Sequence, residues 1–282
     1  MANQPAIKQQ PKFSVAIKSD AYKNMINSTL GDVSIARQFV TDITTVVSQN
    51  PLLGECDAGS IISAGLIAQT LKLPMASTLG FAYIIPYNCK NKSTGAYEHK
   101  AQFQIGFKGL IQLCQRSGQF ESLGVRTVHE GEYCGQDEFG DDVFKFSHDC
   151  DSKPVVGYFA YFKLLNGFKK TLYWTKEQCE AHGRRYSKQY GKLWTTDFDA
   201  MAQKTVLKML LSKYAPMSVE LQKAVTFDQS VVKEDGTPDY IDNPANDEPA
   251  EKPSVEAPQL ALDIPDYDPL TGEVAGDEGA DR

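Results

Sequence analysis

The sequence predicts an α+β fold in which helices flank an antiparallel β-sheet, followed by an acidic tail. Hydrophobic residues recur at helical spacing in the first third, alternate between about residues 80 and 174, and return to helical spacing up to residue 225. Residues 229–282 hold 15 Asp or Glu against 3 Lys or Arg, a balance of −12, so the total of −7 leaves +5 for residues 1–228. A basic body therefore carries an acidic tail.

The N-terminal region predicts two helices after a polar arm. Residues 1–30 are weakly patterned, so we expect a flexible arm with some helix. Ordered structure is expected to begin near Asp32, the candidate N-cap of a helix that ends before Pro51. Its apolar positions have helical spacing: Ile35, Phe39, Ile43 and Val46 or Val47. A second helix is expected over residues 58–71.

The middle of the chain predicts strands and one helix. Residues 81–87 and 97–107 alternate as strands on either side of a turn-rich segment. A helix near residues 108–118 ends at a glycine, and a strand over residues 120–128 follows. Asn166-Gly167 favours a two-residue type I′ hairpin turn, which would place Leu165 opposite Phe168 and Tyr161 opposite Leu172.

Three further helices are expected, over residues 175–190, 195–214 and 218–225, the first capped by Thr175. We therefore expect one folded domain over residues 31–228. The tail, residues 229–282, holds seven of the fourteen prolines and few aromatic residues, so we expect disorder after about Val232. Competition with a polyanion, recruitment of a partner and a passive solubility role all fit such a tail.

Several classes of protein are disfavoured. No apolar run reaches the roughly 20 residues that span a bilayer, and the start has no signal-peptide region, so we expect a soluble cytoplasmic protein. The six cysteines form no CxxC pair, and neither a GxSxG nor a phosphate-binding GxxxxGKS/T motif is present. The acidic stretch at residues 130–142 is expected to be a solvated hairpin tip, although its carboxylates also suggest metal ligands. We expect no catalytic residue and no bound metal.

Positive charge is concentrated between Lys163 and Lys213, where eleven Lys or Arg face four acids. These cations are interleaved with aromatic residues: Tyr173, Trp174, Tyr186, Tyr190 and Trp194. Cations neutralise phosphates and flat rings stack on unpaired bases, so the mixture favours single-stranded nucleic acid. A solvated surface around core aromatics fits the same composition. On a helical wheel Lys204 and Lys208 project away from the apolar side, with no acid between them to pair with either.

A second candidate cluster lies on the strand over residues 97–107 and the helix after it. Lys100, Gln102 and Gln104 share one side of that strand and lead to Lys108 and Arg116. Gly106 and Gly109 flank Phe107 and Lys108, which would allow close backbone approach or a sharp strand-to-helix turn, and the helix N-terminus would present free amides to a phosphate.

A metal-dependent nuclease is the alternative enzyme class. Glu98 and Lys100 have the Glu-x-Lys form of one large nuclease group, in which an upstream Asp helps to hold magnesium. Asp57 is such an upstream candidate, but it lies on an expected helix rather than on a neighbouring strand. A passive protein that coats single strands is the other alternative.

Four blocks in order, TLGFAYIIPY, AQFQIGFKGLIQLCQRSGQ, VVGYFAYFKLLNGFKKTLYWTKE and DFDAMAQKTVLKMLLSKYAPMS, resemble the RecT family of phage recombinases over roughly residues 60–228. The resemblance implies a RecT/Redβ-like single-strand annealing fold. It also implies an ATP-independent protein that coats single-stranded DNA, assembles into rings or helical filaments and pairs complementary strands. Magnesium would at most modulate it. The implied partners are a phage 5′-to-3′ exonuclease and the host single-stranded-DNA-binding protein.

The resemblance also favours particular DNA contacts. Matching positions are Lys108, Arg116, Lys204 and Lys208 as backbone contacts, with Gln102, Gln104 and Phe107 as neighbours in the same groove. This chain has Gln203 where family members place a second cation beside Lys204. The segment before that block matches less clearly, and its candidates are Lys188, Lys192 and Trp194.

Overall fold

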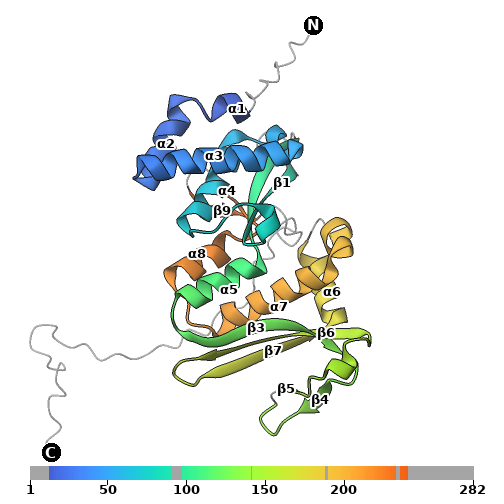
Figure 1. Cartoon of the computed structure of the whole chain (residues 1–282). Coiled ribbons are helices and arrows are strands. Elements are labelled where there is room, and N and C mark those ends of the chain that lie inside the picture. Colours follow the sequence, from blue (N-terminus) through green and yellow to red (C-terminus); the bar gives the residue numbers. More distant parts are fainter. Residues whose placement is uncertain (1–12, 91–96, 141, 188–189, 233–235, 241–282) are drawn as a thin grey trace, which may run out of the picture. The chain divides into compact units, whose positions relative to one another are not determined.

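The computed structural model describes residues 13–90, 97–140, 142–187, 190–232 and 236–240. These residues form helices and small antiparallel sheets, as the sequence predicts (Figure 1). Among the helices described, none combines the length and the apolar character that a bilayer crossing requires.

The N-terminal part of the body consists of helices. They are α1 (Phe13–Ala16), α2 (Asp20–Leu30), α3 (Val33–Gln49), the 3-10 turn η1 (Pro51–Glu55) and α4 (Ala58–Thr70). The predicted cap of α3 is confirmed, because the Asp32 carboxylate accepts hydrogen bonds from the backbone N–H groups of Ser34 and Ile35. The prediction that ordered structure begins near Asp32 is wrong. Phe13, Ile17 and Ile26 are buried in the core, so apolar contacts hold the described part of the expected arm in place.

The predicted strand pair is present as a hairpin. β1 (Ala82–Lys90) and β2 (Tyr97–Ile105) pair antiparallel after the 3-10 turn η2 (Ser77–Leu79), and α5 (Phe107–Arg116) follows directly. β2 also bonds to the chain's C-terminal part, where the Phe103 N–H donates to the Ser230 carbonyl. β8 (Val231–Val232) and β9 (Pro238–Asp239) then pair with each other. The body thus extends past residue 228 to Tyr240, beyond the boundary that the sequence predicts; residues 241–282 lie outside the described part.

A three-stranded antiparallel sheet forms the second half of the body, in the order β3 (Phe120–His129), β6 (Val155–Leu164) and β7 (Lys169–Thr175). The predicted hairpin is present, but its register differs by one residue, since Ala160 rather than Tyr161 lies opposite Leu172. Of the two turn residues only Gly167 has a positive φ, +89°, and the Leu164 N–H donates to the Phe168 carbonyl. The loop therefore has three residues instead of a two-residue type I′ turn.

The two faces of this sheet are covered differently. Tyr158, Ala160 and Phe162 of β6 are buried on the face that packs against the helices. On the other face a hairpin of β4 (Tyr133–Gln136) and β5 (Asp142–Phe144) brings Phe144 against Phe159, with ring centroids 4.6 Å apart. The acidic stretch therefore lies in a hairpin, as predicted. The 3-10 turn η3 (His148–Cys150) leads back to the sheet.

The C-terminal helices are α6 (Lys176–Tyr186), the π-helical turn η4 (Tyr190–Trp194), α7 (Phe198–Tyr214) and α8 (Val219–Phe227). Thr175 and Gln178 form the capping box of α6, as its sequence predicts. Helix α7 packs against the three-stranded sheet on one side and α5 on the other, and it also contacts α6 (Figure 1). Since both sides of α7 are covered, its residues are buried around most of its circumference.

Candidate nucleic-acid interface

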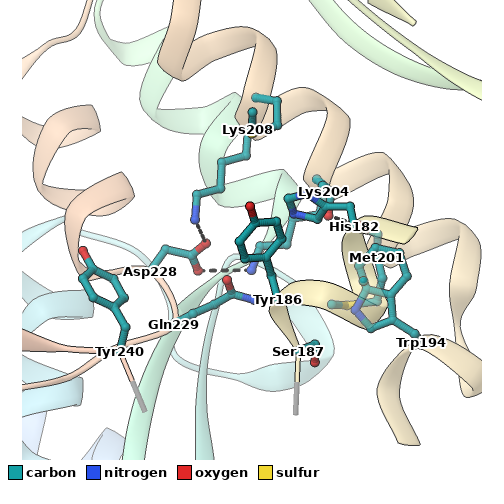
Figure 2. Close-up of a pocket in the computed structure, with 13 residues that line it drawn as sticks. His182, Tyr186, Ser187, Trp194, Met201, Lys204, Lys208, Asp228, Gln229 and Tyr240 are labelled. Atoms are coloured by element: carbon teal, nitrogen blue, oxygen red, sulfur yellow. Dashed lines mark hydrogen bonds and ion pairs between the residues drawn. The ribbon is translucent and has the colours of Figure 1, made fainter. Parts of the chain in front are cut away.

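A pocket of about 210 Å³ lies between α6, α7 and the segment that follows α8 (Figure 2). One part of its wall is charged and polar, and the other part is aromatic or carries methionine. The lining residues are His182, Gly183, Tyr186, Ser187, Trp194, Met201, Lys204, Thr205, Lys208, Met209, Asp228, Gln229 and Tyr240. Two of the lysines that the sequence singles out therefore lie in one pocket with flat rings.

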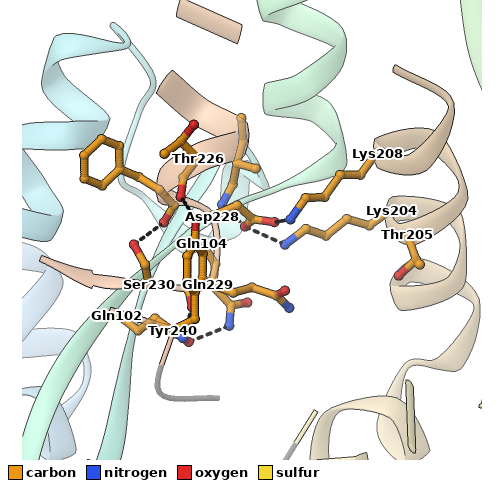
Figure 3. Close-up of polar contacts among 12 residues, drawn as sticks. Gln102, Gln104, Lys204, Thr205, Lys208, Thr226, Asp228, Gln229, Ser230 and Tyr240 are labelled. Carbon is orange, nitrogen blue, oxygen red and sulfur yellow. Dashed lines mark hydrogen bonds and ion pairs between the residues drawn. The ribbon is translucent and has the colours of Figure 1, made fainter. Parts of the chain in front are cut away.

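Asp228 organises the charged wall. Its carboxylate accepts hydrogen bonds from Lys204 Nζ at 3.1 Å and from Lys208 Nζ at 2.6 Å (Figures 2 and 3). Asp228 Oδ1 also accepts the backbone N–H of Ile105, 3.0 Å away at the end of β2. Three elements, α7, α8 and β2, thus meet at one carboxylate.

The charge balance at this wall is positive. Asp228 is 1% exposed, and burial by itself raises the pKa of a carboxyl group. Lys204 and Lys208 outweigh that burial, so the pKa of Asp228 lies below its usual range and the group is ionised. The pocket lining holds two lysines and one aspartate, so its formal charge is positive while His182 is neutral. That charge attracts an anion such as a phosphate.

Lys204 does not project into solvent as the helical wheel predicts. It is 9% exposed, and its ammonium pairs with Asp228. The wheel assumes a helix with one buried side, whereas α7 packs on two sides. Asp228 lies 24 residues further along the chain, so inspection of the helix alone could not find it. Lys208 is the more accessible of the two, with 24% of its side chain exposed.

The polar side of β2 is likewise buried rather than open. The Gln102 amide donates to the Gln229 carbonyl at 2.6 Å, and the Gln104 amide donates to the Gln102 side chain at 3.0 Å (Figure 3). Both side chains therefore bond to the protein, contrary to the predicted open groove, because the chain after α8 folds back over β2. Lys100 lies further along the strand and pairs with Glu98 at 3.6 Å.

The candidates on α5 form a separate group outside the pocket lining. Lys108 is exposed near the helix start, and its chain lies close to Gly80. Arg116 is exposed at the helix end, where its guanidinium donates to the Leu71 carbonyl at 2.7 Å. Phe107, at the first position of α5, is partly buried. The structure therefore does not bring these residues into one wall with Lys204 and Lys208.

The predicted close approach at the start of α5 is confirmed. Gly106 caps the helix, and a Cβ atom built there would lie 2.0 Å from the Gly80 carbonyl oxygen. At Gly109 the corresponding distance to the Phe81 carbonyl oxygen is 2.3 Å. Both glycines are needed for the path of the backbone, so their presence gives no separate support to a DNA contact.

Trp194 lines the pocket but is buried. Its indole lies against Gly183, where a Cβ atom would come within 2.7 Å, and its ring neighbours are Tyr190 and Phe198. Because these neighbours cover it, Trp194 does not offer the open ring face that the sequence predicts for base stacking. Lys188 and the side chain of Lys192 lie outside the described residues.

Sequence reasoning missed several lining residues. Asp228 stands at the end of a short helix, where it reads as an ordinary cap, and Tyr240 falls in the predicted tail. The His182 ring packs against Tyr186, with centroids 4.6 Å apart. Burial, together with the positive charges of Lys208 and Arg185, lowers the pKa of His182, so the imidazole is neutral near pH 7. For the aromatic part of the wall, the sequence pointed to Tyr186 and Trp194 alone.

Asp57, the upstream residue of the nuclease alternative, is hydrogen-bonded within the protein. The Asp57 carboxylate accepts the Ser60 N–H at 2.8 Å as the cap of α4, and the Asp57 N–H donates to the His99 carbonyl. Within the described residues, no group of three His, Cys, Asp or Glu side chains could hold a metal ion.

Comparison with known proteins assigns the family. The model of the RecT family matches residues 37–244. The chain belongs to the RecT family. The uncharacterized protein YqaK of Bacillus subtilis (strain 168) is 40% identical over 229 residues, 78% of this chain and 76% of that protein. Protein RecT of Escherichia coli (strain K12) is 33% identical over 216 residues, 76% of this chain and 78% of that protein. Membership of the RecT family supports a role in DNA recombination.

Proposed function

We propose that this RecT-family protein binds single-stranded DNA and promotes ATP-independent annealing of complementary strands in homologous recombination. Family membership supports the role in recombination, and the pocket supports the ligand class. The observation that carries the proposal is the placement of Lys204 and Lys208 beside the rings of His182, Tyr186 and Tyr240. Ammonium groups suit phosphates, and rings suit unpaired bases.

In this proposal the protein makes no covalent bond. Lys208 contacts a phosphate at the pocket mouth, while the aromatic wall receives a base or sugar. Neutralising phosphates lowers the repulsion between two strands, and base pairing then supplies the sequence specificity. The reaction needs no ATP and no catalytic residue, and magnesium at most modulates it.

The wider setting follows from the family resemblance. We infer that copies of the chain assemble into a ring or helical filament that keeps one strand extended, with the N-terminal helices supplying part of the subunit contact. The partners are a phage 5′-to-3′ exonuclease and the host single-stranded-DNA-binding protein, and the site of action is the cytoplasm of the bacterial host.

An annealing assay tests the proposal directly. Purified protein is mixed with complementary labelled oligonucleotides without nucleotide, with and without magnesium. Accelerated duplex formation with intact strands is the expected result. Strands shortened only in the presence of magnesium would instead identify a nuclease, and strand binding without acceleration would identify a passive coating protein.

Lys208→Gln tests the pocket. We expect several-fold weaker binding of a dT oligonucleotide, because one accessible cation is lost. The slope of log affinity against log salt should fall by about 0.7, the value for one phosphate contact on a single strand. Lys18→Gln is the matched control, since Lys18 is an exposed lysine at the other end of the described chain. Equal effects of the two variants would exclude a specific role for the pocket.

A further inference from the structure

The loop between β6 and β7 exposes apolar side chains. Leu165 is 68% exposed and Phe168 is 46% exposed, although both flank the Asn166-Gly167 pair of a tight hairpin. In Figure 1 this loop lies at the end of the sheet away from β4 and β5. The turn itself requires only the positive φ of Gly167. A turn that merely connects two strands would favour polar residues at such exposed positions.

Lysines flank the same loop in an unfavourable arrangement. Lys163 and Lys169 are directly opposite in the strand register, and like charges in opposite positions destabilise a sheet. Glu121 offsets one of them, through a contact of 2.8 Å to Lys163 Nζ. For Lys169 the described residues provide no acidic partner in an ion pair. An anion bound between the side chains of Lys163 and Lys169 would relieve the repulsion between them.

Two more cations, Lys170 of β7 and Lys213 of α7, lie beside the aromatic ring of Tyr214 at the end of α7. Lys170 Nζ lies 5.7 Å and Lys213 Nζ 5.2 Å from the centre of the Tyr214 ring. Lys163 and Lys169 lie on one face of this end of the sheet, and Lys170 and Lys213 lie on the other face, where Phe168 contacts Phe162. Glu121 forms an ion pair with Lys163 of this group.

We propose that this basic hairpin end, comprising Lys163, Leu165, Phe168, Lys169 and Lys213, binds a second single strand of DNA. Its lysines match phosphates, and the exposed Phe168 ring and Leu165 side chain match unpaired bases, which a duplex would keep stacked. The pocket described above does not include any of these five residues.

The hairpin end and the pocket share helix α7, so the protein could hold two strands at once. This step rests on the proposed function. Lys208 lines the pocket, and Lys213 follows it five residues later on α7. At about 1.5 Å and about 100° per residue, the two are about 7.5 Å apart along the helix and about 140° apart around it. A strand in the pocket and a strand at the hairpin end would therefore lie on two sides of one helix.

The test measures uptake of a second strand by the full chain. Protein saturated with an unlabelled dT oligonucleotide is mixed with a labelled oligonucleotide of non-complementary sequence, and the species that carries both strands is quantified. Wild type is expected to hold both strands. Phe168→Ala combined with Lys169→Gln should leave affinity for the first strand within about twofold and weaken second-strand uptake at least tenfold.

Two further variants keep the result decisive. Lys169→Gln with Lys213→Gln leaves the Phe168 ring in place, so a matching loss of uptake cannot come from disturbed packing against Phe162. Lys18→Gln controls for the loss of one charge. Unchanged second-strand uptake in both double variants would overturn the inference, while the proposed function would stand if the first strand still bound. Loss of first-strand binding by wild type would instead reject the proposed function.

A second copy of this chain is the competing occupant of the hairpin end. Light scattering of the same variants without DNA separates the two occupants. Unchanged particle mass together with lost second-strand uptake supports the strand surface. A fall in particle mass in both double variants would assign the loop to a subunit contact and overturn the inference.

Discussion

Asp228 joins parts of the chain that are far apart in sequence. Its carboxylate bonds to Lys204 and Lys208 on α7 and to the Ile105 N–H at the end of β2. It is almost fully buried, so the two ammonium groups are what make its negative charge tolerable. The same contacts hold Lys208 in the pocket wall, which couples the stability of the fold to the proposed DNA site.

Asp228→Asn should destabilise the fold by about 3 kcal/mol, because it leaves a buried lysine without its counter-charge. The asparagine keeps the size of the side chain and an acceptor for the Ile105 N–H, so the charge is the main change. Chemical denaturation of both proteins measures the effect. Asp20→Asn is the control, since Asp20 pairs with Lys23 on the surface and should contribute less than about 1 kcal/mol. Equal effects of the two substitutions would contradict the assigned role of Asp228.

The stability that Asp228 provides should depend on pH in a defined direction. Its pKa is lower in the folded protein than in the unfolded chain, where it is about 3.9. Its contribution is therefore complete above about pH 4 and lost as the pH falls through the folded-state pKa. The difference in unfolding free energy between wild type and Asp228→Asn should be constant from about pH 5 to 7 and shrink below about pH 4. A difference that grows on acidification would show that the sign is wrong.

At the scale of elements, the turn from β2 into α5 depends on a backbone contact. The chain at Gly106 passes so close to the Gly80 carbonyl that no side chain fits between them. This contact fixes the direction in which α5 leaves the β1–β2 hairpin, and with it the positions of Lys108 and Arg116.

Gly106→Ala should cost about 2 to 3 kcal/mol, since the added methyl group must displace backbone rather than a flexible side chain. Thermal or chemical unfolding measures the change. Gly54→Ala is the control, because the nearest atom to a Cβ there, Val47 Cγ1, is 3.9 Å away and its effect should stay within about 0.5 kcal/mol. A neutral Gly106→Ala would show that the two segments can separate freely.

The local pattern of apolar residues predicted helices and strands correctly wherever one face of the element is buried. Asp32, Thr175 and the spacing of α3 located helix starts correctly, because caps and periodicity act within a few residues. The loop at Asn166-Gly167 was predicted as a turn, but its length was not, because the choice between two and three residues depends on the register in which β6 and β7 pair.

The candidate site was predicted only in part. Lys204 and Lys208 were found from sequence, yet their carboxylate partner was not, since a contact across 20 or more residues leaves no local pattern. Gln102 and Gln104 looked exposed because strand alternation shows which residues share a face, but not what covers that face. The DNA-contact roles of all these residues remain predictions.

For the whole molecule, the last described residues belong to the body rather than to the tail. Val231 is buried, the Ser230 carbonyl accepts the Phe103 N–H, and the Tyr240 hydroxyl donates to the Thr226 carbonyl. These contacts close the body over β2. The composition of residues 229–282 hides this, because the acidic and proline-rich part dominates the average.

A chain that ends at Tyr240 should match the full chain in unfolding free energy within about 0.5 kcal/mol, because it keeps all of these contacts. A chain that ends at Gln229 loses the Ser230 carbonyl that accepts the Phe103 N–H and loses the burial of Val231, so it should be less stable by about 3 kcal/mol. Urea unfolding of the three lengths compares them. Equal stability of the two shorter chains would restore the predicted boundary at residue 228.

Because Asp228 is buried, dissolved salt should affect its ion pairs with the lysines much less than it affects the binding of DNA in the pocket. Dissolved ions screen exposed charges strongly and buried pairs much less, so salt that strips a polyanion from the pocket leaves the lysine ammoniums anchored. A protein freed from one strand in this way keeps its cations in place and can engage the next strand without first rebuilding its site.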